Sequence, residues 1–310
     1  MRGSISAEDL ARATRLLVVR SRHEATGLFA GNYASAFRGG GLEFEESRPY
    51  APGDDVTALD ASATARTGEL YVKRFREERN QTLLFALDGS GSMGFGSRDR
   101  TKAETAAHAL ALIAAAAGRA GDRTGLLAFD TSVREEIAPG RGGAHGLRVI
   151  RSAAAHALRP GGETRLGSAL RALRATTRRR SIVLLLSDFR DAALFPPEPE
   201  PARLRAELAE LSRRHDVIAA PVIDPLEEDL PPVGPVRFRD LEQPGATRLL
   251  QTRRKGVRRR YRTAARRWRA RLEGELRRSG ADVLWLRTDR DPIHTLGRFF
   301  HERAARRARR

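Results

Sequence analysis

The stretch TLLFALDGSGSMG, residues 82–94, joins an apolar run to a turn of glycine and serine. The apolar run at 83–87 predicts a buried strand, because it has no polar face to leave in water. The turn then places Asp88, Ser90 and Ser92 at every second position. Three kinds of site have turns of this composition: a dinucleotide-binding loop, the nucleophile turn of a serine hydrolase, and a metal site.

Apolar runs and helical patterns alternate from this strand to the end of the chain. Further strands are predicted at 125–129, 133–137, 181–187, 216–223 and 281–287, the second of them an antiparallel edge strand. Helices are predicted at 101–120, 143–158, 166–177, 201–214, 254–279 and 292–308. This alternation is typical of an α/β fold with a doubly wound, mostly parallel sheet flanked by helices. In such a sheet ligands bind beyond the carboxyl ends of the strands, where residues 88–92 would lie.

The N-terminal part of the chain, 1–80, does not follow this alternation. It begins with a helical pattern at 7–20 and continues through a glycine-rich stretch. Two polar, strand-like segments at 42–50 and 69–79 then flank a turn-rich loop. We therefore predict an N-terminal helix and a β-rich extension that precede the α/β domain.

The α/β domain, predicted at 81–310, carries nearly all of the net charge at its C-terminal end. Proline-punctuated residues 224–252 are predicted as a hairpin insertion, and a basic segment, 253–310, follows. The formal net charge of the chain is +18, and residues 245–310 contribute 22 Arg and Lys against 6 Asp and Glu. Such a segment can attract nucleic acid, acidic protein surfaces or anionic lipid; alternatively, its arginines form solvated helix faces.

The basic helix predicted at 254–279 also carries an apolar stripe. Its members recur at steps of three and four residues: Val257, Tyr261, Ala265, Trp268, Leu272 and Leu276. We expect this stripe to pack on the sheet, because the apolar strand at 281–287 follows directly and needs a helix to cover it.

Composition limits the environment and the chemistry. The chain has no cysteine, which excludes disulfides and thiolate metal sites. No apolar run approaches the roughly 18 residues of a membrane span, and the N-terminal sequence lacks a signal-peptide pattern. We therefore expect a soluble, cytoplasmic protein.

The dinucleotide interpretation rests on the spacing Gly89-x-Gly91-x-x-Gly94 after a strand. Asp88 argues against it, because its carboxylate would lie where the pyrophosphate binds. In addition, Asp130 at the end of the next strand lies 36 residues beyond Gly94, whereas the ribose-binding acid is expected after about 20. We therefore do not favour this interpretation.

The hydrolase interpretation would make Ser92 the nucleophile, with Asp188 and either His215 or His294 downstream. However, Ser90 replaces the first glycine of the nucleophile motif. His215 precedes a strand and His294 lies in a predicted helix, so neither is expected at the site. A serine hydrolase therefore remains a less favoured alternative.

The metal interpretation predicts donors elsewhere in the chain, because Mg²⁺ binds about six oxygens and one short loop cannot supply them. Thr164 follows a glycine pair just before a predicted helix, and Asp188 ends the apolar strand at 181–187. Both would lie at the carboxyl edge of the sheet. The predicted ligands of a Mg²⁺ ion, or of Mn²⁺ or Ca²⁺, are Asp88, Ser90, Ser92, Thr164 and Asp188.

These five residues, in this order, resemble the metal-ion-dependent adhesion site of von Willebrand factor A domains. Two upstream blocks, GLEFEESRPYAPGDD at 41–55 and SATARTGELYVKRFREERN at 62–80, resemble the bacterial domain-of-unknown-function 58 family. The resemblance continues through SDFRD at 187–191 and DVLWLRTDRDP at 282–292. It implies a von Willebrand factor A-like domain, which in that family is often encoded beside a MoxR-type AAA+ ATPase.

The ligand set indicates docking rather than catalysis. Only Asp88 and Asp188 supply charge, so a divalent ion keeps affinity for one more anionic oxygen, which a partner's acidic side chain can provide. No histidine or spare carboxylate other than Glu163 lies near the motif as a general base. We therefore expect a metal-dependent adaptor that works with a MoxR-type ATPase in assembly or remodelling of a client protein. The alternative is nucleic-acid or anionic-surface binding through the basic segment.

Overall fold

The computed structural model describes residues 7–37, 42–51, 54, 58–77, 81–177, 179–195, 203–242, 245 and 247–308. Within these residues no helix combines the length and the apolarity needed to cross a bilayer.

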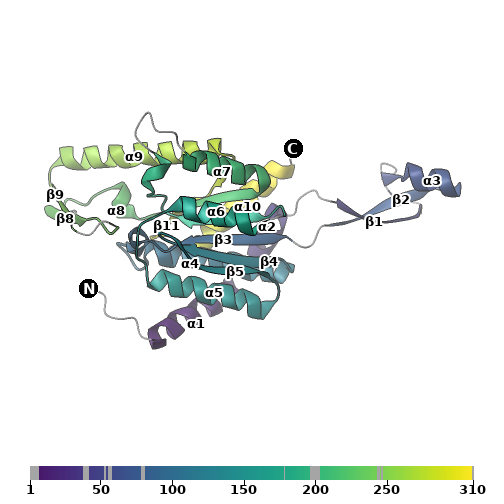
Figure 1. Cartoon of the computed structure of the whole chain (residues 1–310), viewed down its shortest axis with the longest axis horizontal. Helices are drawn as coiled ribbons and strands as arrows, with labels where there is room; N and C mark the ends of the chain where they lie inside the picture. The colour runs from purple at the N-terminus through teal and green to yellow at the C-terminus, as the bar shows by residue number, and fades with distance from the viewer. Residues whose placement is uncertain are drawn as a thin grey trace.

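A seven-stranded sheet forms the centre of the molecule (Figure 1). Its main path runs in the order β10 (Asp282–Val283), β7 (Asp216–Ile223), β6 (Ile182–Ser187), β3 (Thr82–Asp88), β4 (Arg123–Phe129) and β5 (Val133–Gly140), and β11 (Leu286–Arg287) also pairs with β7. Every pairing in this sheet is parallel except β4 with β5. The predicted α/β class and the antiparallel edge strand are thus confirmed.

The strand predicted at 281–287 is present only as two short pieces, β10 and β11. Both pair with β7 in one continuous register, Asp282 beside Ile218 and Leu286 beside Val222. The interruption falls where the indole of Trp285 donates to Glu273 on the helix that covers this edge, 3.1 Å away. Backbone bonding to β7 continues across the interruption, since Leu284 N donates to Ala219 O at 2.9 Å.

Helices cover both faces of the sheet, as a doubly wound fold requires. One face is covered by α4 (Lys102–Ala120), α5 (Gly143–Leu158) and α10 (Pro292–Ala308), and α1 (Ala7–Glu24) and α2 (Leu28–Phe37) pack on these helices. The other is covered by α6 (Leu166–Thr176), α7 (Arg203–Arg214) and α9 (Lys255–Arg278). Each face has its own hydrophobic cluster, so β3 and β6 are buried on both sides.

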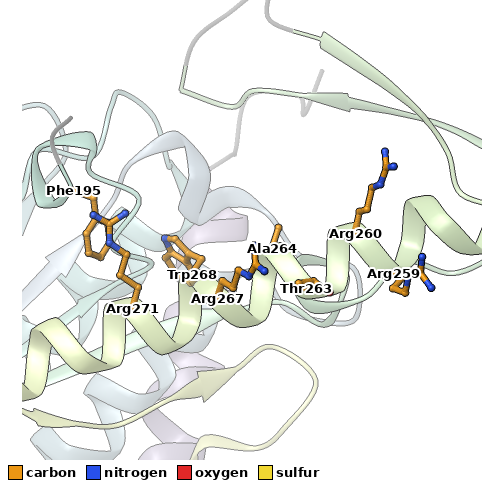
Figure 2. A pocket seen from close by; sticks show the side chains of 8 residues that line it. All are labelled: Phe195, Arg259, Arg260, Thr263, Ala264, Arg267, Trp268 and Arg271. Carbon is orange, nitrogen blue, oxygen red and sulfur yellow. The ribbon is translucent and has the colours of Figure 1, made fainter. Parts of the chain in front are cut away.

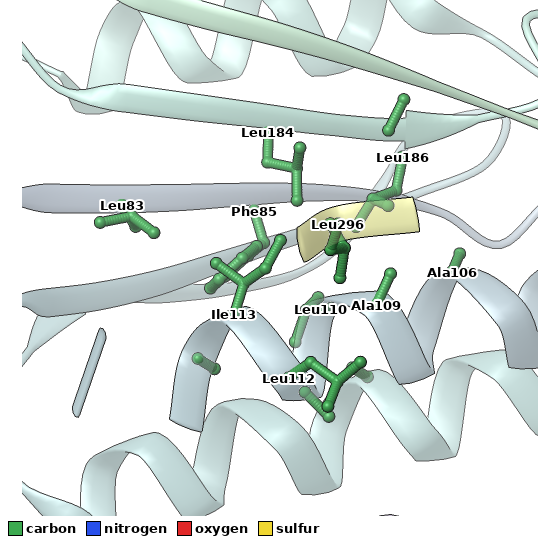
Figure 3. Packing of buried hydrophobic residues seen from close by; sticks show 14 of the residues in the cluster. Leu83, Phe85, Ala106, Ala109, Leu110, Leu112, Ile113, Leu184, Leu186 and Leu296 are labelled. Atoms are coloured by element: carbon green, nitrogen blue, oxygen red, sulfur yellow. The ribbon is translucent and has the colours of Figure 1, made fainter. Parts of the chain in front are cut away.

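Helix α4 lies on the centre of the sheet because its sequence defines both its ends and its packing face. Thr101 and Glu104 form a reciprocal capping box at its start, and Gly121 ends it with a φ of 81°. Small alanines bring the helix close to the strands, so that Leu110 and Ile113 pack near Phe85 (Figure 3). This packing holds the start of α4 beside the carboxyl ends of the strands.

Helices α1 and α2 pack on the α/β body rather than on the extension. Phe29, Tyr33 and Phe37 of α2 form an aromatic cluster with Phe300 of α10. The sequence patterns did not reveal α2, because it is short and its apolar face meets another helix. The domain boundary predicted at residue 80, between the N-terminal part and the α/β domain, stays a prediction.

The extension consists of β1 (Leu42–Pro49), α3 (Ala61–Thr67) and β2 (Tyr71–Glu77), and it projects from the body (Figure 1). Strands β1 and β2 pair antiparallel, with Leu42 beside Glu77. Helix α3 lies in the segment predicted as a loop and is capped by the Asp60 carboxylate, which accepts from Ser62 N and Ala63 N.

The predicted hairpin insertion is present as β8 (Pro235–Arg239) and β9 (Thr247–Gln251), after the short helix α8 (Pro225–Glu228). It lies at the end of the body opposite the extension (Figure 1). This is the end at which the parallel strands of the sheet terminate.

Candidate metal centre

The two predicted acidic ligands lie at the switch point of the sheet. Strand β3 has β4 on one side and β6 on the other, and the chain leaves it first towards β4. Asp88 is the last residue of β3, and Asp188 directly follows β6, in the register that places Leu87 beside Leu186. Both carboxylates therefore reach the carboxyl edge of the sheet, where ligands bind in folds of this kind.

Backbone hydrogen bonds join the Asp88 loop to the loop that carries Thr164. Gly161 N donates to Gly89 O at 2.8 Å, and Gly91 N donates to Gly162 O at 2.9 Å. These bonds bring Thr164 Oγ1 within 2.9 Å of Ser90 Oγ, although 74 residues separate the two in sequence. The predicted threonine thus reaches the site through loop pairing.

All five predicted ligands meet in one buried cluster. Ser90 Oγ lies 3.3 Å from Ser92 Oγ, and the Ser92 hydroxyl bonds to Asp188. Ser90 N donates to Asp88 Oδ1 at 2.8 Å. Both aspartates are only 1% exposed. Hard oxygens gathered without histidine or cysteine favour Mg²⁺, Mn²⁺ or Ca²⁺ over zinc.

The backbone after β6 is strained, and hydrogen bonds of Ser187 hold this strained loop beside Asp88. Phe189 has a φ of 57°, which is costly for a bulky residue. Its N–H donates to the Ser187 hydroxyl at 2.9 Å, and that hydroxyl donates to Asp88 Oδ2 at 2.5 Å. One serine thereby links the strained loop of Asp188 to Asp88.

The two carboxylates differ in their pKa. Burial, and then the charge of Asp188, raise the pKa of Asp88 to about 7. Burial would also raise the pKa of Asp188, but the Lys102 ammonium beside it holds that pKa below its ordinary value. A metal ion at Asp88 would remove the cost of its buried charge, so the donor set fits a divalent cation.

Lys102 is a site residue that the sequence reasoning missed. Its Nζ lies 2.6 Å from Asp188 Oδ2 and 2.9 Å from Glu227 Oε1, and the side chain is 1% exposed. Helical spacing offered a signal, because Lys102 shares the sheet-facing side of α4 with Ala106 and Ile113. A lysine on a buried helix face needs an anionic partner.

Glu242 is a second residue that was missed, and it comes from the hairpin insertion. Its Oε1 lies 2.6 Å from Thr164 Oγ1, and its Oε2 accepts from Thr164 N at 3.1 Å. A cavity of about 420 Å³ lies between the site and the hairpin, bordered by Ser92, Lys102 and Glu242. No local pattern marked Glu242, because it follows β8 in a turn.

The histidines of the hydrolase interpretation lie away from Ser92. The ring of His215 contacts Thr177 Oγ1 at 3.0 Å and accepts from Ser181 N, which is at the amino end of β6. His294 is exposed on α10. The geometry therefore gives Ser92 no histidine base from either candidate.

A group of Glu24, His108 and Asp291 also has the spacing of metal ligands. Arginines already satisfy it, however: Arg20 pairs with Glu24 and Asp291 at 2.5 Å each, and Arg100 contacts His108 at 3.1 Å. This group is an ion-pair network that fixes α1 to α4 and to the start of α10.

The basic segment presents an arginine-rich surface on α9 (Figure 2). A shallow cavity of about 640 Å³ there is lined by Phe195, Arg259, Arg260, Thr263, Ala264, Arg267, Trp268 and Arg271. Arg271 lies over the Phe195 ring, 4.3 Å from its centroid. Other arginines are internally paired, such as Arg262 with Asp229 at 2.7 Å. Thus only part of the positive charge of α9 is left for a partner.

The chain belongs to the family described as "Protein of unknown function DUF58", which matches residues 46–271. Uncharacterized protein Mb1516 of Mycobacterium bovis is 32% identical over 304 residues, covering 98% of this chain and 92% of that protein. Uncharacterized protein MAV169 of Mycobacterium avium is 36% identical over 138 residues, covering 44% of this chain and 75% of that protein. The predicted family is thus confirmed.

Two solved structures also align with the chain. BatB from Bacteroides thetaiotaomicron has a TM-score of 0.44 at 14% identity, covering 74% of this chain and 100% of that one. A von Willebrand factor type A structure from Catenulispora acidiphila has a TM-score of 0.41 at 16% identity, covering 76% of this chain and 44% of that one. At these identities the similarity concerns the fold alone.

Proposed function

We propose that this protein is a metal-dependent docking adaptor. The observation that carries the proposal is the buried cluster at the switch point, where two carboxylates and three hydroxyls from three separate loops converge. Lys102 compensates the charge of Asp188, whereas ionising the buried Asp88 beside it remains costly, and a bound cation would remove that cost.

The charges of the site favour a further anionic ligand. Asp88 and Asp188 supply two negative charges, and Lys102 neutralises part of that charge. When bound, a divalent ion would supply a Lewis-acidic centre with net positive charge. The hydroxyls of Ser90, Ser92 and Thr164 orient the site without adding charge. An acidic side chain of a partner is therefore the ligand that this arrangement favours.

The partner that we propose is a MoxR-type AAA+ ATPase or its client protein, with the adaptor acting in assembly or remodelling in the cytoplasm. This choice of partner rests on the resemblance to the domain-of-unknown-function 58 family. It predicts that binding requires both the metal and the ligand cluster of this chain.

Metal binding is tested by thermal melting with Mg²⁺ or Mn²⁺. A ligand that binds only the native state raises the melting temperature by mass action. Asp88→Asn should remove this increase while preserving the shape of the side chain. Glu163→Gln is the matched control, because Glu163 is an exposed neighbour of Thr164 that pairs with Arg165 at 2.6 Å. Equal responses of wild type and Asp88→Asn would refute the metal assignment.

Docking is tested by co-purification from native lysate with Mg²⁺ or with a chelator. The proposed ATPase or client should be recovered with wild type and Glu163→Gln in Mg²⁺, and lost with Asp88→Asn or chelator. Recovery that is independent of both the metal and Asp88 would contradict docking at this site.

A second candidate function is polyanion binding by α9. Arg259, Arg260, Arg266 and Arg267 are exposed, and none has an ion pair within the described part of the chain. Replacement of these four by alanine should weaken binding to duplex DNA and reduce its salt dependence, because each phosphate contact contributes to the salt slope. Unchanged affinity and slope would leave these arginines as a solvated face.

A further inference from the structure

We infer that Glu242 is an internal ligand of the proposed metal centre, so that the β8–β9 hairpin holds the position a partner's acidic side chain would take. This inference rests on the proposed function and adds a way in which docking is regulated. In the resting protein the site is completed from within the chain, and a partner must displace the hairpin to dock.

The first argument is the contact itself. Both carboxylate oxygens of Glu242 are directed at one predicted ligand, with Oε1 at 2.6 Å from Thr164 Oγ1 and Oε2 at 3.1 Å from Thr164 N. The same Thr164 hydroxyl lies 2.9 Å from Ser90 Oγ. The Glu242 carboxylate thus adjoins the oxygens predicted to hold the ion, and carboxylate is the ligand type such an ion favours.

The second argument is how closely the hairpin sits on the metal loop. A Cβ atom on Gly91 would lie only 2.4 Å from the carbonyl oxygen of Leu241, the residue before Glu242. Only glycine at position 91 lets these two backbones approach in this way. The Asp88 loop is therefore shaped to receive the hairpin.

The hairpin also packs against α9. The Phe238 ring in β8 packs against Tyr261 of α9, with centroids 6.2 Å apart, and the Tyr261 hydroxyl donates to Leu226 O at 2.9 Å. These contacts hold the hairpin between α9 and the site. The cavity of about 420 Å³ beside Glu242 borders the hairpin, so a partner segment that enters it would meet the Glu242 carboxylate first.

The third argument is the charge balance around the site. Among the described residues, the carboxylates of Asp88, Asp188, Glu227 and Glu242 gather with the cations of Lys102 and Arg190. Arg239 and Asp240, which line the same cavity, add one charge of each sign. The remaining two negative charges match one divalent ion. An added acid from a partner would exceed this balance unless Glu242 withdrew, so exchange of one carboxylate for another is the favoured route.

The test uses Mn²⁺ alone as the probe and water-proton relaxation as the readout, in wild type, Glu242→Gln and Glu163→Gln. If the Glu242 carboxylate is a ligand of the ion, its loss should weaken Mn²⁺ binding roughly 10- to 100-fold, as loss of a metal-site partner does. At saturating Mn²⁺, Glu242→Gln should also relax water protons faster per bound ion, because water enters the vacated position. Glu163→Gln should behave as wild type.

Acetate then tests the exchange. It should bind the exposed ion in Glu242→Gln and lower the relaxation rate again, while leaving wild type unchanged. Gly91→Ala is a second variant that keeps Glu242 but displaces the hairpin, and it should reproduce the faster relaxation.

Outcomes separate this inference from the proposed function. If wild type binds Mn²⁺ and all four proteins give equal relaxation per ion and equal response to acetate, Glu242 is not an internal ligand and the inference is overturned, while metal-dependent docking stands. If wild type and Glu242→Gln both fail to bind Mn²⁺, the proposed function fails, and the inference fails with it.

Discussion

Asp88 and Asp188 lie at the carboxyl ends of neighbouring strands, yet their surroundings shift their pKa values in opposite directions. Asp88 accepts from hydroxyl and amide donors and has no ion pair with any residue that the structure describes, whereas Asp188 accepts from Lys102 at 2.6 Å. Burial acts on both carboxyls in the same direction, and the neighbouring charges make their pKa values differ. Asp88 is therefore the carboxyl of the two whose charge is expected to change near neutral pH.

The raised pKa of Asp88, about 7, predicts a pH dependence of metal binding. Between about pH 4 and about pH 7, Asp88 keeps its proton in the metal-free folded protein but loses it in the unfolded chain. The contribution of Asp88 to the unfolding free energy therefore declines as pH rises through this range. Metal needs the ionised form. The melting-temperature increase caused by Mn²⁺ should thus be larger at pH 8 than at pH 6, and Asp88→Asn should show neither increase.

Lys102 provides a second prediction at this scale. Lys102→Met leaves Asp188 and Glu227 without their buried cation, so the metal-free protein should lose about 3–5 kcal/mol of unfolding free energy. The extra negative charge should also strengthen Mn²⁺ binding, so that the metal restores more stability than it adds to wild type. Chemical unfolding with and without Mn²⁺ measures both effects.

The matched control for Lys102→Met is Lys255→Met, which removes an exposed lysine at the start of α9. It should change stability by no more than about 0.5 kcal/mol. Equal losses in the two variants would mean that the buried pair does not stabilise the fold.

At the scale of elements, α9 has two halves with different roles. Leu272 and Leu276 in its second half are fully buried against the sheet, as the predicted stripe required. The first half covers the hairpin, where Tyr261 is only partly buried. One amphipathic helix thus contacts both the core of the body and the β8–β9 hairpin beside the candidate site.

Trp268 lies where the two halves meet. It packs edge-on against Trp285, and the Arg190 guanidinium lies 3.9 Å from the centroid of its ring. Trp268→Ala should lower the unfolding free energy by about 3 kcal/mol, the lower end for such deletions, because the ring is partly exposed. Arg267→Ala on the exposed face is the control. A loss of less than about 0.5 kcal/mol for Trp268→Ala would show that α9 does not depend on this contact.

At the scale of the whole molecule, the extension and the hairpin lie at opposite ends of the body (Figure 1). No residue of 42–77 belongs to either hydrophobic cluster of the body among the described residues. The extension has its own small buried set, which includes Ala63 and Val72. The metal centre therefore does not depend on the extension for its support.

Excision of 42–77 tests this independence. The ends of the segment are adjacent, because Leu42 pairs with Glu77, so a short Gly-Ser linker can replace it. The shortened protein should keep the melting temperature of wild type within a few degrees, about 1 kcal/mol in a domain of this size, and should keep its response to Mn²⁺. Loss of cooperative melting would show that the extension stabilises the body.

The sequence by itself determined the α/β class and most of the elements of the body. Long apolar runs such as β6 are strands because nothing in them tolerates water, and α4 begins where Thr101 and Glu104 can cap it. The five oxygen donors could be predicted because parallel strands end at one edge, which turns positions along the chain into neighbours in space. The metal that they would bind stays a prediction.

Only the tertiary structure decided which other charged residues lie at the carboxyl edge of the sheet. Glu242 follows an exposed hairpin strand, and no periodicity links it to Thr164, 78 residues earlier. Helix α2 escaped prediction for a related reason, since its aromatic face packs against Phe300 near the other end of the chain and its Tyr33 hydroxyl donates to Asp122. Local patterns record whether a residue is buried, whereas a contact between distant segments depends on how whole elements pack.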